Sequence, residues 1–148
     1  MDRVVLFLAS GSFVGYVPIA SGTFGSLLAL PLLVWLAAAG LSTGAVVALV
    51  AFAGCAAMPI CGRAGRIYGQ ADSSRIVLDE ICGMLIAGAL LPPTLWTLTL
   101  AFLAFRFFDI VKPFPAGYFD RNVKNGIGVV ADDLVAGVYA NLVVRMLT

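Results

Sequence analysis

The chain has 148 residues, of which 61% are hydrophobic and 11% are charged, and its formal net charge at pH 7 is +1. A soluble domain needs a largely polar surface, so this composition predicts an integral membrane protein with a single helical domain over residues 1–148. The small net charge provides no broad basic field, so nucleic acid is not an expected partner.

The N-terminal stretch, residues 1–17, is apolar but is interrupted by glycines and followed by Pro18. No small-residue cleavage site follows it, so we expect a short interfacial or re-entrant helix and not a signal peptide. Ser21 to Ser26 then open the first long apolar run, Leu27 to Gly40. Hydroxyls and glycines at a helix start predict capping, and they also predict free backbone N–H groups suited to a phosphate.

Four further apolar runs follow the first. They are Thr43 to Cys61, Ile76 to Leu91, Thr94 to about Val111, and Ile127 to the C-terminus. Two polar segments separate them, Gly62 to Arg75 and Lys112 to Gly126, and the aromatic residues of the second suit the membrane surface. The predicted fold class is therefore all-α, a polytopic transmembrane bundle of about four to five spans plus the short N-terminal helix.

Basic residues are unevenly distributed between the two ends of these spans. Arg3 and both polar segments fall on one side, whereas the turns Leu41 to Gly44 and Pro92-Pro93 carry no charge. The positive-inside rule places the charged side in the cytoplasm. We therefore expect a multi-pass membrane protein whose charged end faces the cytoplasm.

Polar groups from four helix ends reach this cytoplasmic level. They are Thr23 in the first span, Asp79 and Glu80 in the third, Arg106 and Asp109 in the fourth, and Asp132 and Asp133 in the last. An ionised carboxylate inside a membrane costs about 2.5 to 3.5 kcal/mol on insertion scales, so a compensating partner is needed. The five carboxylates exceed the two nearby cations, Arg106 and Lys112. The excess predicts Mg²⁺, with Asp79, Glu80, Asp109, Asp132 and Asp133 as candidate ligands.

Arg106, Asp109 and Lys112 recur at a spacing of three, which puts all three on one face if the helix continues to Pro113. Such a ladder is either a structural salt-bridge stripe or a binding site for a phosphomonoester, with a guanidinium for its oxygens and an ammonium as a point charge. The sequence contains no histidine, so a phosphohistidine intermediate is excluded and hydrolysis would rest on carboxylates, hydroxyls or thiols.

Four blocks of the sequence together resemble one enzyme family. They are Ser-Gly-Thr-Phe-Gly-Ser at 21–26, Ile-Val-Leu-Asp-Glu-Ile-Cys-Gly at 76–83, Phe-Arg-Phe-Phe-Asp-Ile-Val-Lys-Pro-Phe-Pro at 105–115, and Gly-Ile-Gly-Val-Val-Ala-Asp-Asp-Leu-Val-Ala-Gly at 126–137. In this order they are similar to the phosphatidylglycerophosphatase A family, except that Ser21 stands where the family usually has proline. The resemblance implies a bacterial inner-membrane phosphatase that converts phosphatidylglycerophosphate to phosphatidylglycerol and phosphate with Mg²⁺.

The resemblance also implies roles for single residues. Carried over position by position, the matching acidic and basic residues are Asp79, Glu80, Arg106, Asp109, Lys112, Asp132 and Asp133, and the resemblance leaves open which carboxylate is ligand and which is base. We expect catalytic roles for Asp79, Arg106, Asp109, Asp132 and Asp133, and phosphate binding by Thr23, Arg106 and Lys112. In the expected mechanism a carboxylate-held Mg²⁺ polarises the phosphoryl group and activates a water, while Arg106 and Lys112 neutralise the phosphoryl oxygens.

A small ion or proton-coupled transporter is the alternative reading, because carboxylates inside a membrane often line a transport path. A transporter spreads its ionisable groups through the membrane depth and often carries inverted repeats. Here the ionisable groups gather at one face, which favours the phosphatase.

Overall fold

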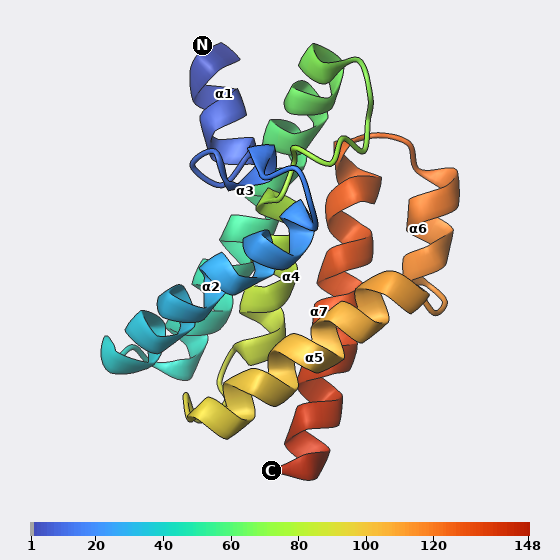
Figure 1. Ribbon diagram of the computed structural model, residues 1–148. Coiled ribbons are helices and arrows are strands. Elements are labelled where there is room, and N and C mark those ends of the chain that lie inside the picture. The colour runs from blue at the N-terminus through green and yellow to red at the C-terminus, as the bar shows by residue number, and fades with distance from the viewer. Residues whose placement is uncertain (1) are drawn as a thin grey trace.

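The computed structural model describes residues 2–148, and within that range the chain is helical with no strand (Figure 1). Its elements are α1 (Asp2–Ala9), the 3₁₀ helix η1 (Val14–Tyr16), α2 (Ser21–Ala38), α3 (Thr43–Tyr68), α4 (Leu78–Gly88), α5 (Leu95–Val111), α6 (Ala116–Asn122) and α7 (Gly126–Leu147). The predicted all-α class is confirmed.

Three helices, α2, α3 and α7, are long and apolar enough to cross a membrane, judged by length and composition. The 17 residues of α5 are at the lower limit for a span. The 11 residues of α4 extend only about 16 Å, about half of the hydrocarbon core. The all-α bundle thus contains one helix that stops inside it, and the number of spans stays a prediction.

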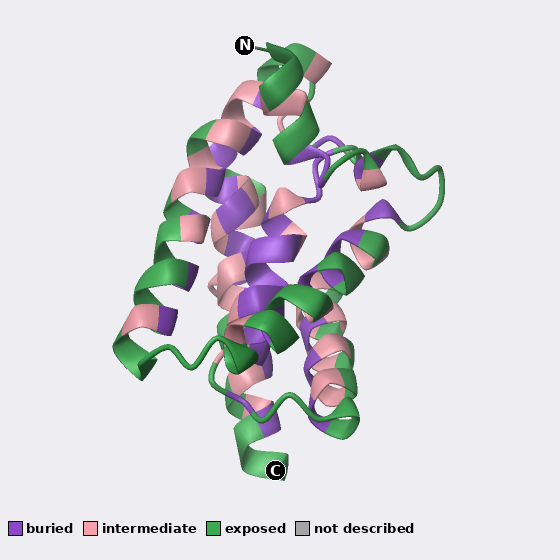
Figure 2. Ribbon diagram, turned by 90° about the vertical axis from the view of Figure 1, so that its left-hand side faces the viewer, coloured by how far each residue is buried: buried purple, intermediate pink, exposed green. Residues whose placement is uncertain are grey.

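The short helix α4 occupies the centre of the bundle, where it packs against α2, α3, α5 and α7 (Figure 1). Figure 2 shows that buried residues concentrate on this central helix. Its closest neighbour is α7, because glycines face each other there. A Cβ on Gly83 would lie 2.7 Å from the carbonyl oxygen of Asp133, and one on Gly137 would collide with the Gly83 carbonyl oxygen. This close approach sets the start of α4 beside Asp132 and Asp133.

The C-terminal end of α4 lies inside the bundle, where its free carbonyl groups need donors. The side-chain nitrogen of Asn141 on α7 lies 3.0, 3.1 and 2.9 Å from the carbonyl oxygens of Ile86, Ala87 and Ala89. Arg145 in turn donates to Oδ1 of Asn141 over 2.7 Å. One side chain of α7 therefore allows α4 to end partway through the bundle.

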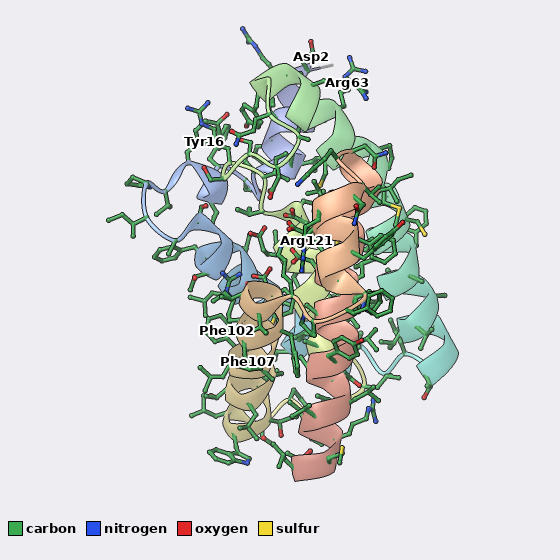
Figure 3. All side chains as sticks on the ribbon, turned by 90° about the vertical axis from the view of Figure 1, so that its right-hand side faces the viewer. Asp2, Tyr16, Arg63, Phe102, Phe107 and Arg121 are labelled. Atoms are coloured by element: carbon green, nitrogen blue, oxygen red, sulfur yellow. The ribbon has the colours of Figure 1, made fainter. Side chains whose placement is uncertain are left out.

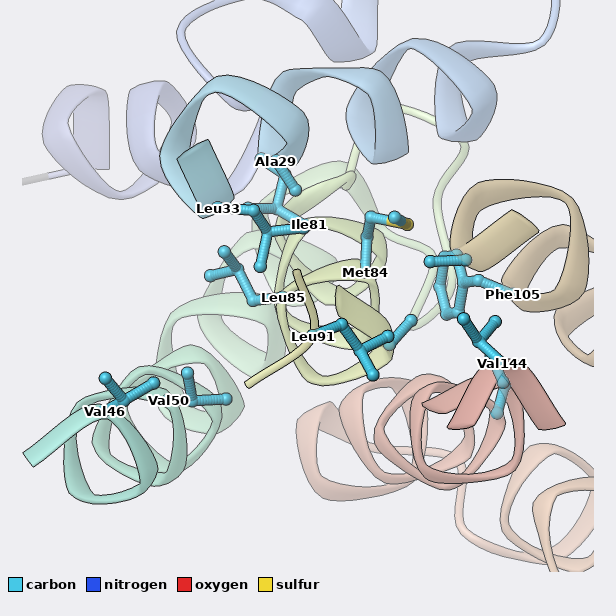
Figure 4. Close-up of a cluster of buried hydrophobic side chains, with 14 of the residues drawn as sticks. Ala29, Leu33, Val46, Val50, Ile81, Met84, Leu85, Leu91, Phe105 and Val144 are labelled. Carbon is cyan, nitrogen blue, oxygen red and sulfur yellow. The ribbon is translucent and has the colours of Figure 1, made fainter. Parts of the chain in front are cut away.

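An apolar layer fills the space between α2, α4, α5 and α7 (Figure 4). Phe105 and Met84 are completely buried there, and Leu33, Leu91 and Val144 pack around them. Between helices in a bilayer, such close packing contributes van der Waals attraction, which together with interhelical hydrogen bonds drives helix association.

The two ends of the bundle differ in character. Figure 1 shows α1, the α3–α4 connection, α6 and the start of α7 at one end, and the α2–α3 turn, the α4–α5 turn and the C-terminus at the other. Arg145 lies near the C-terminus, whereas the elements at or next to the first end carry Arg3, Arg63, Arg66, Arg75, Arg121 and Lys124. This arrangement agrees with the predicted grouping of charged segments on one side.

The polar segment predicted between Gly62 and Arg75 is helical in its first half. Helix α3 continues to Tyr68 and ends at Gly69, whose φ of 72° is left-handed and favours glycine. Arg63 in this extension forms an ion pair with Asp2 of α1 over 2.7 Å, and its hydrogen bond lowers the pKa of Asp2 (Figure 3). The connection between α3 and α4 is therefore shorter than the sequence predicted.

The connection from α3 to α4 is held by an aromatic pair. The Arg75 guanidinium lies 5.5 Å from the ring centroids of both Tyr16 and Tyr68, whose hydroxyls are 2.9 Å apart. A guanidinium over two aromatic faces is held by cation–π attraction. The N-terminal segment, predicted as a short interfacial or re-entrant helix, thus consists of α1 and η1 packed at the charged end, and Met1 lies outside the described residues.

The predicted hydroxyl cap at the start of α2 is wrong. Ala20, with a left-handed φ of 53°, occupies the cap position and provides no side-chain acceptor. The Ser21 hydroxyl instead donates to the carbonyl oxygen of Ser74 over 2.6 Å, and the Ser26 hydroxyl donates to the carbonyl oxygen of Gly22 over 2.8 Å. The hydroxyl of Ser21 therefore ties the start of α2 to the segment before α4.

Candidate active site

A cavity of about 140 Å³ lies at the charged end of the bundle, where α4, α5, α6 and α7 meet the α3–α4 connection. It is lined by seven carboxylates and two lysines, together with Ala71, Val123 and Val129. The charged lining residues are Asp72, Asp79, Glu80, Asp109, Lys112, Asp120, Lys124, Asp132 and Asp133. All five predicted carboxylates and Lys112 thus reach one cavity.

Three of these carboxylates form a tight cluster. Asp79 and Glu80 from the first turn of α4 and Asp133 from α7 each offer an oxygen, and these oxygens lie within 4.8 Å of one another. Asp79 and Asp133 are buried, and Oε2 of Glu80 is buried with no hydrogen-bond partner among residues 2–148. Like charges this close cannot all persist without a compensating cation. Such a set of oxygens suits a hard divalent cation.

Lys112 also lines the cavity, but not in the way that the sequence predicted. Helix α5 ends at Val111, and Lys112 adopts a left-handed φ of 47° as its C-cap. The side chain therefore leaves the face that carries Asp109. Its Nζ atom lies 2.7 Å from Oδ1 of Asp120 and 2.5 Å from Oδ2 of Asp132. The expected three-residue ladder is broken after its second member.

These contacts hold Lys112 in its charged form. Partial burial lowers the pKa of Lys112, but the hydrogen bonds to Asp120 and Asp132 outweigh burial and raise it above its usual value. The hydrogen bond from Lys112 likewise lowers the pKa of Asp120. The Oδ1 atom of Asp132 is buried and makes no hydrogen bond within the described part of the chain. One oxygen of Asp132 is thus free while the other is fixed.

Arg106 approaches the carboxylate cluster from the side of α2. Its Nη1 atom lies 2.6 Å from Oδ2 of Asp109, an ion pair in which no Nη1–H points at an acceptor in residues 2–148. A Cβ on Gly22 would lie 3.3 Å from that Nη1 atom and would also collide with a Glu80 oxygen. The first turn of α2 therefore lies against Arg106 and Glu80. Arg106 and the half-buried Thr23 do not line the cavity itself.

Three charged residues of the cavity were not predicted from the sequence. Asp72 lies in the α3–α4 connection, Asp120 lies on α6, and Lys124 precedes α7. The signal that could have identified Asp120 is its position eight residues after Lys112, across a segment rich in proline. If the chain reverses direction in that segment, the Asp120 carboxylate comes close to Lys112.

Clustered carboxylates, a guanidinium and an ammonium thus lie at one end of a bundle in which three helices are long and apolar enough to cross a membrane. The family model described as Phosphatidylglycerophosphatase A matches residues 7–148. Phosphatidylglycerophosphatase A of Haemophilus influenzae is 39% identical over 140 residues, which cover 93% of this chain and 84% of the relative. The protein of the same name from Escherichia coli is 39% identical over 132 residues, which cover 88% and 76%.

A third relative, from Bacteroides thetaiotaomicron, is provisionally named a phosphatidylinositol-3-phosphatase and is 35% identical over 152 residues, which cover 95% of this chain and 91% of the relative. No solved structure matches the chain. The chain belongs to the phosphatidylglycerophosphatase A family and is a phosphoric monoester hydrolase. The predicted family is thereby confirmed, and these comparisons give no support to the transporter alternative.

Proposed function

We propose that this chain hydrolyses the terminal phosphomonoester of phosphatidylglycerophosphate to phosphatidylglycerol and inorganic phosphate. The observation that supports this most strongly is the cavity in which clustered carboxylates face Lys112, with Arg106 alongside, at one end of an apolar bundle. The names of the family and of two relatives point to the same substrate. The name of the third relative also refers to a phosphatase that acts on a phosphorylated lipid.

The cation proposed for this site is Mg²⁺, held by Asp79, Glu80 and Asp133. The proximity of their oxygens and the unpartnered Oε2 of Glu80 support this assignment. Asp109 and Asp132, also predicted as ligands, each contact a cationic side chain instead, which favours a role in positioning Arg106 and Lys112. When bound, Mg²⁺ supplies positive charge that polarises the phosphoryl group.

The side chains of this chain bind the phosphate and move the proton. Arg106 binds two phosphoryl oxygens with its planar guanidinium, and the positive end of the α2 dipole beside Gly22 adds to this attraction. Lys112 stabilises the negative charge that develops on the remaining oxygen. The free Oδ1 of Asp132 accepts a proton from the attacking water as the water oxygen bonds to phosphorus, while Lys112 fixes the other oxygen of that carboxylate. The P–O bond to the glycerol breaks, and the same proton passes to the leaving glycerol oxygen.

Phosphate release from phosphatidylglycerophosphate by the purified protein in detergent tests the activity and its cation. We expect no release in a chelator and full release when Mg²⁺ is restored. Asp2→Asn, which alters an exposed carboxylate outside the cavity, should behave as the wild type does. Release in the chelator would contradict the cation, and hydrolysis of other lipid phosphates alone would contradict the substrate.

We also propose that the charged end faces the cytoplasm of a bacterial inner membrane, on the basis of the positive-inside rule. Single cysteines at the exposed positions Gln70 and Asn122, in a protein without its three native cysteines, should resist a membrane-impermeant thiol reagent in intact cells. A cysteine at Leu41, in the opposite turn, should react. The reverse labelling pattern would overturn this orientation.

A further inference from the structure

A second cavity, of about 410 Å³, adjoins the reaction cavity at the charged end. It lies between the last turns of α3 and the start of α7, and it shares Ala71 and Lys124 with the reaction cavity. Glycines form much of its wall, among them Gly62 and Gly126, whose backbones are too close for a Cβ on Gly126. The two cavities are therefore neighbours on either side of a common wall.

The charge of this second cavity is opposite to that of the first. Its lining includes Arg66 and Lys124 but no carboxylate. Within residues 2–148 the Arg66 guanidinium makes no ion pair or hydrogen bond, and the Lys124 ammonium donates to the backbone carbonyl of Asp120 over 2.6 Å. Two cations without carboxylate partners beside an acidic cavity favour an anionic ligand.

The position of the second cavity relative to the membrane also restricts the kind of ligand that it can bind. Helix α3 has 26 residues, about 39 Å, which exceeds the hydrocarbon thickness of about 30 Å. Arg66 lies in its last turn and Lys124 lies two residues before α7. Both cations therefore lie at the end of a span, at the depth of lipid headgroups.

We propose that this second cavity binds the phosphodiester of the lipid substrate while the terminal phosphomonoester occupies the reaction cavity. The inference rests on the proposed function, which supplies a substrate with two phosphates joined by a glycerol. A phosphodiester keeps its negative charge at neutral pH, and the proposed Mg²⁺, Arg106 and Lys112 are already engaged by the phosphomonoester, so the phosphodiester needs cationic partners of its own. Arg66 and Lys124 attract the phosphodiester. The glycerol that joins the two phosphates then passes Ala71, which lines both cavities.

Product inhibition separates the two cavities, because phosphatidylglycerol carries the phosphodiester alone and inorganic phosphate resembles the phosphomonoester alone. In detergent micelles, Arg66→Gln should weaken inhibition by phosphatidylglycerol about tenfold, the size expected for loss of a charged hydrogen bond. Inhibition by inorganic phosphate should change less than twofold. The matched control is Arg63→Gln, three residues earlier on α3 and outside the cavity, which should leave both constants unchanged.

Several outcomes would overturn the second site. Unchanged inhibition by phosphatidylglycerol in Arg66→Gln, an equal loss for both inhibitors, or the same loss in Arg63→Gln each contradicts it. Arg66→Lys keeps a cation and should recover part of the inhibition. The proposed function fails separately, if the wild-type protein releases no phosphate from phosphatidylglycerophosphate.

Discussion

Asp133→Asn should lower kcat/KM for lipid phosphate hydrolysis about a thousandfold while the protein stays folded. The change keeps the size of the side chain but removes one charge from the cluster with Asp79 and Glu80, so Mg²⁺ loses a ligand. The three clustered carboxylates repel one another when no cation is present, so the variant should melt at a higher temperature than the wild type in a chelator. The measurements are phosphate release across a Mg²⁺ titration and melting temperature with and without Mg²⁺.

Asp132→Asn is the matched comparison, since it alters the neighbouring carboxylate that pairs with Lys112. This variant should also lose activity, because it removes the proposed proton acceptor, but Mg²⁺ should still raise its melting temperature. Its melting temperature in a chelator should fall, because Lys112 keeps only Asp120 as an anionic partner. If Asp133→Asn kept full activity, or if Mg²⁺ stabilised both variants equally, the assignment of Asp133 to the cation would be wrong.

Arg106→Lys should lower kcat/KM about a hundredfold, although the positive charge is retained. A guanidinium holds two phosphoryl oxygens in one plane, and an ammonium cannot reproduce that geometry. The ion pair with Asp109 can still form, so the melting temperature should change little. Arg121→Lys, on the exposed side of α6 and outside the cavity, should retain wild-type kinetics. Near-native turnover of Arg106→Lys would instead identify Arg106 as a structural ion-pair partner.

The level of the site was predictable from the sequence, because spans that alternate in direction bring their polar ends together. Asp79 at the start of α4 and Asp133 near the start of α7 needed only this alternation to reach one cavity. Which carboxylates meet was not predictable, because it depends on the close approach of α4 and α7. Gly83 and Gly137 permit that approach. In the sequence alone, however, glycines at these positions indicate only that some pair of helices packs closely, and not which pair.

The partners of Lys112 could not be predicted from the sequence either, for a different reason. A three-residue spacing from Asp109 predicts a shared face only while the helix continues, and the left-handed backbone at Lys112 ends it. The same change of direction brings in Asp120 from α6, which helical periodicity cannot link to α5. The extension of α3 from Cys61 to Tyr68 was also not predicted. A segment rich in arginine and glycine is typical of a loop when its packing is unknown.

The short central helix has a consequence for the permeability barrier of the membrane. The carboxylates need water on one side, but a continuous hydrated path through the bundle would leak protons and ions. Phe105, Met84 and Val144 form a buried apolar layer on α5, α4 and α7, and the side-chain nitrogen of Asn141 donates to carbonyl groups at the end of α4. We therefore expect this apolar layer to keep water and ions from passing between the charged cavity and the opposite end of the bundle.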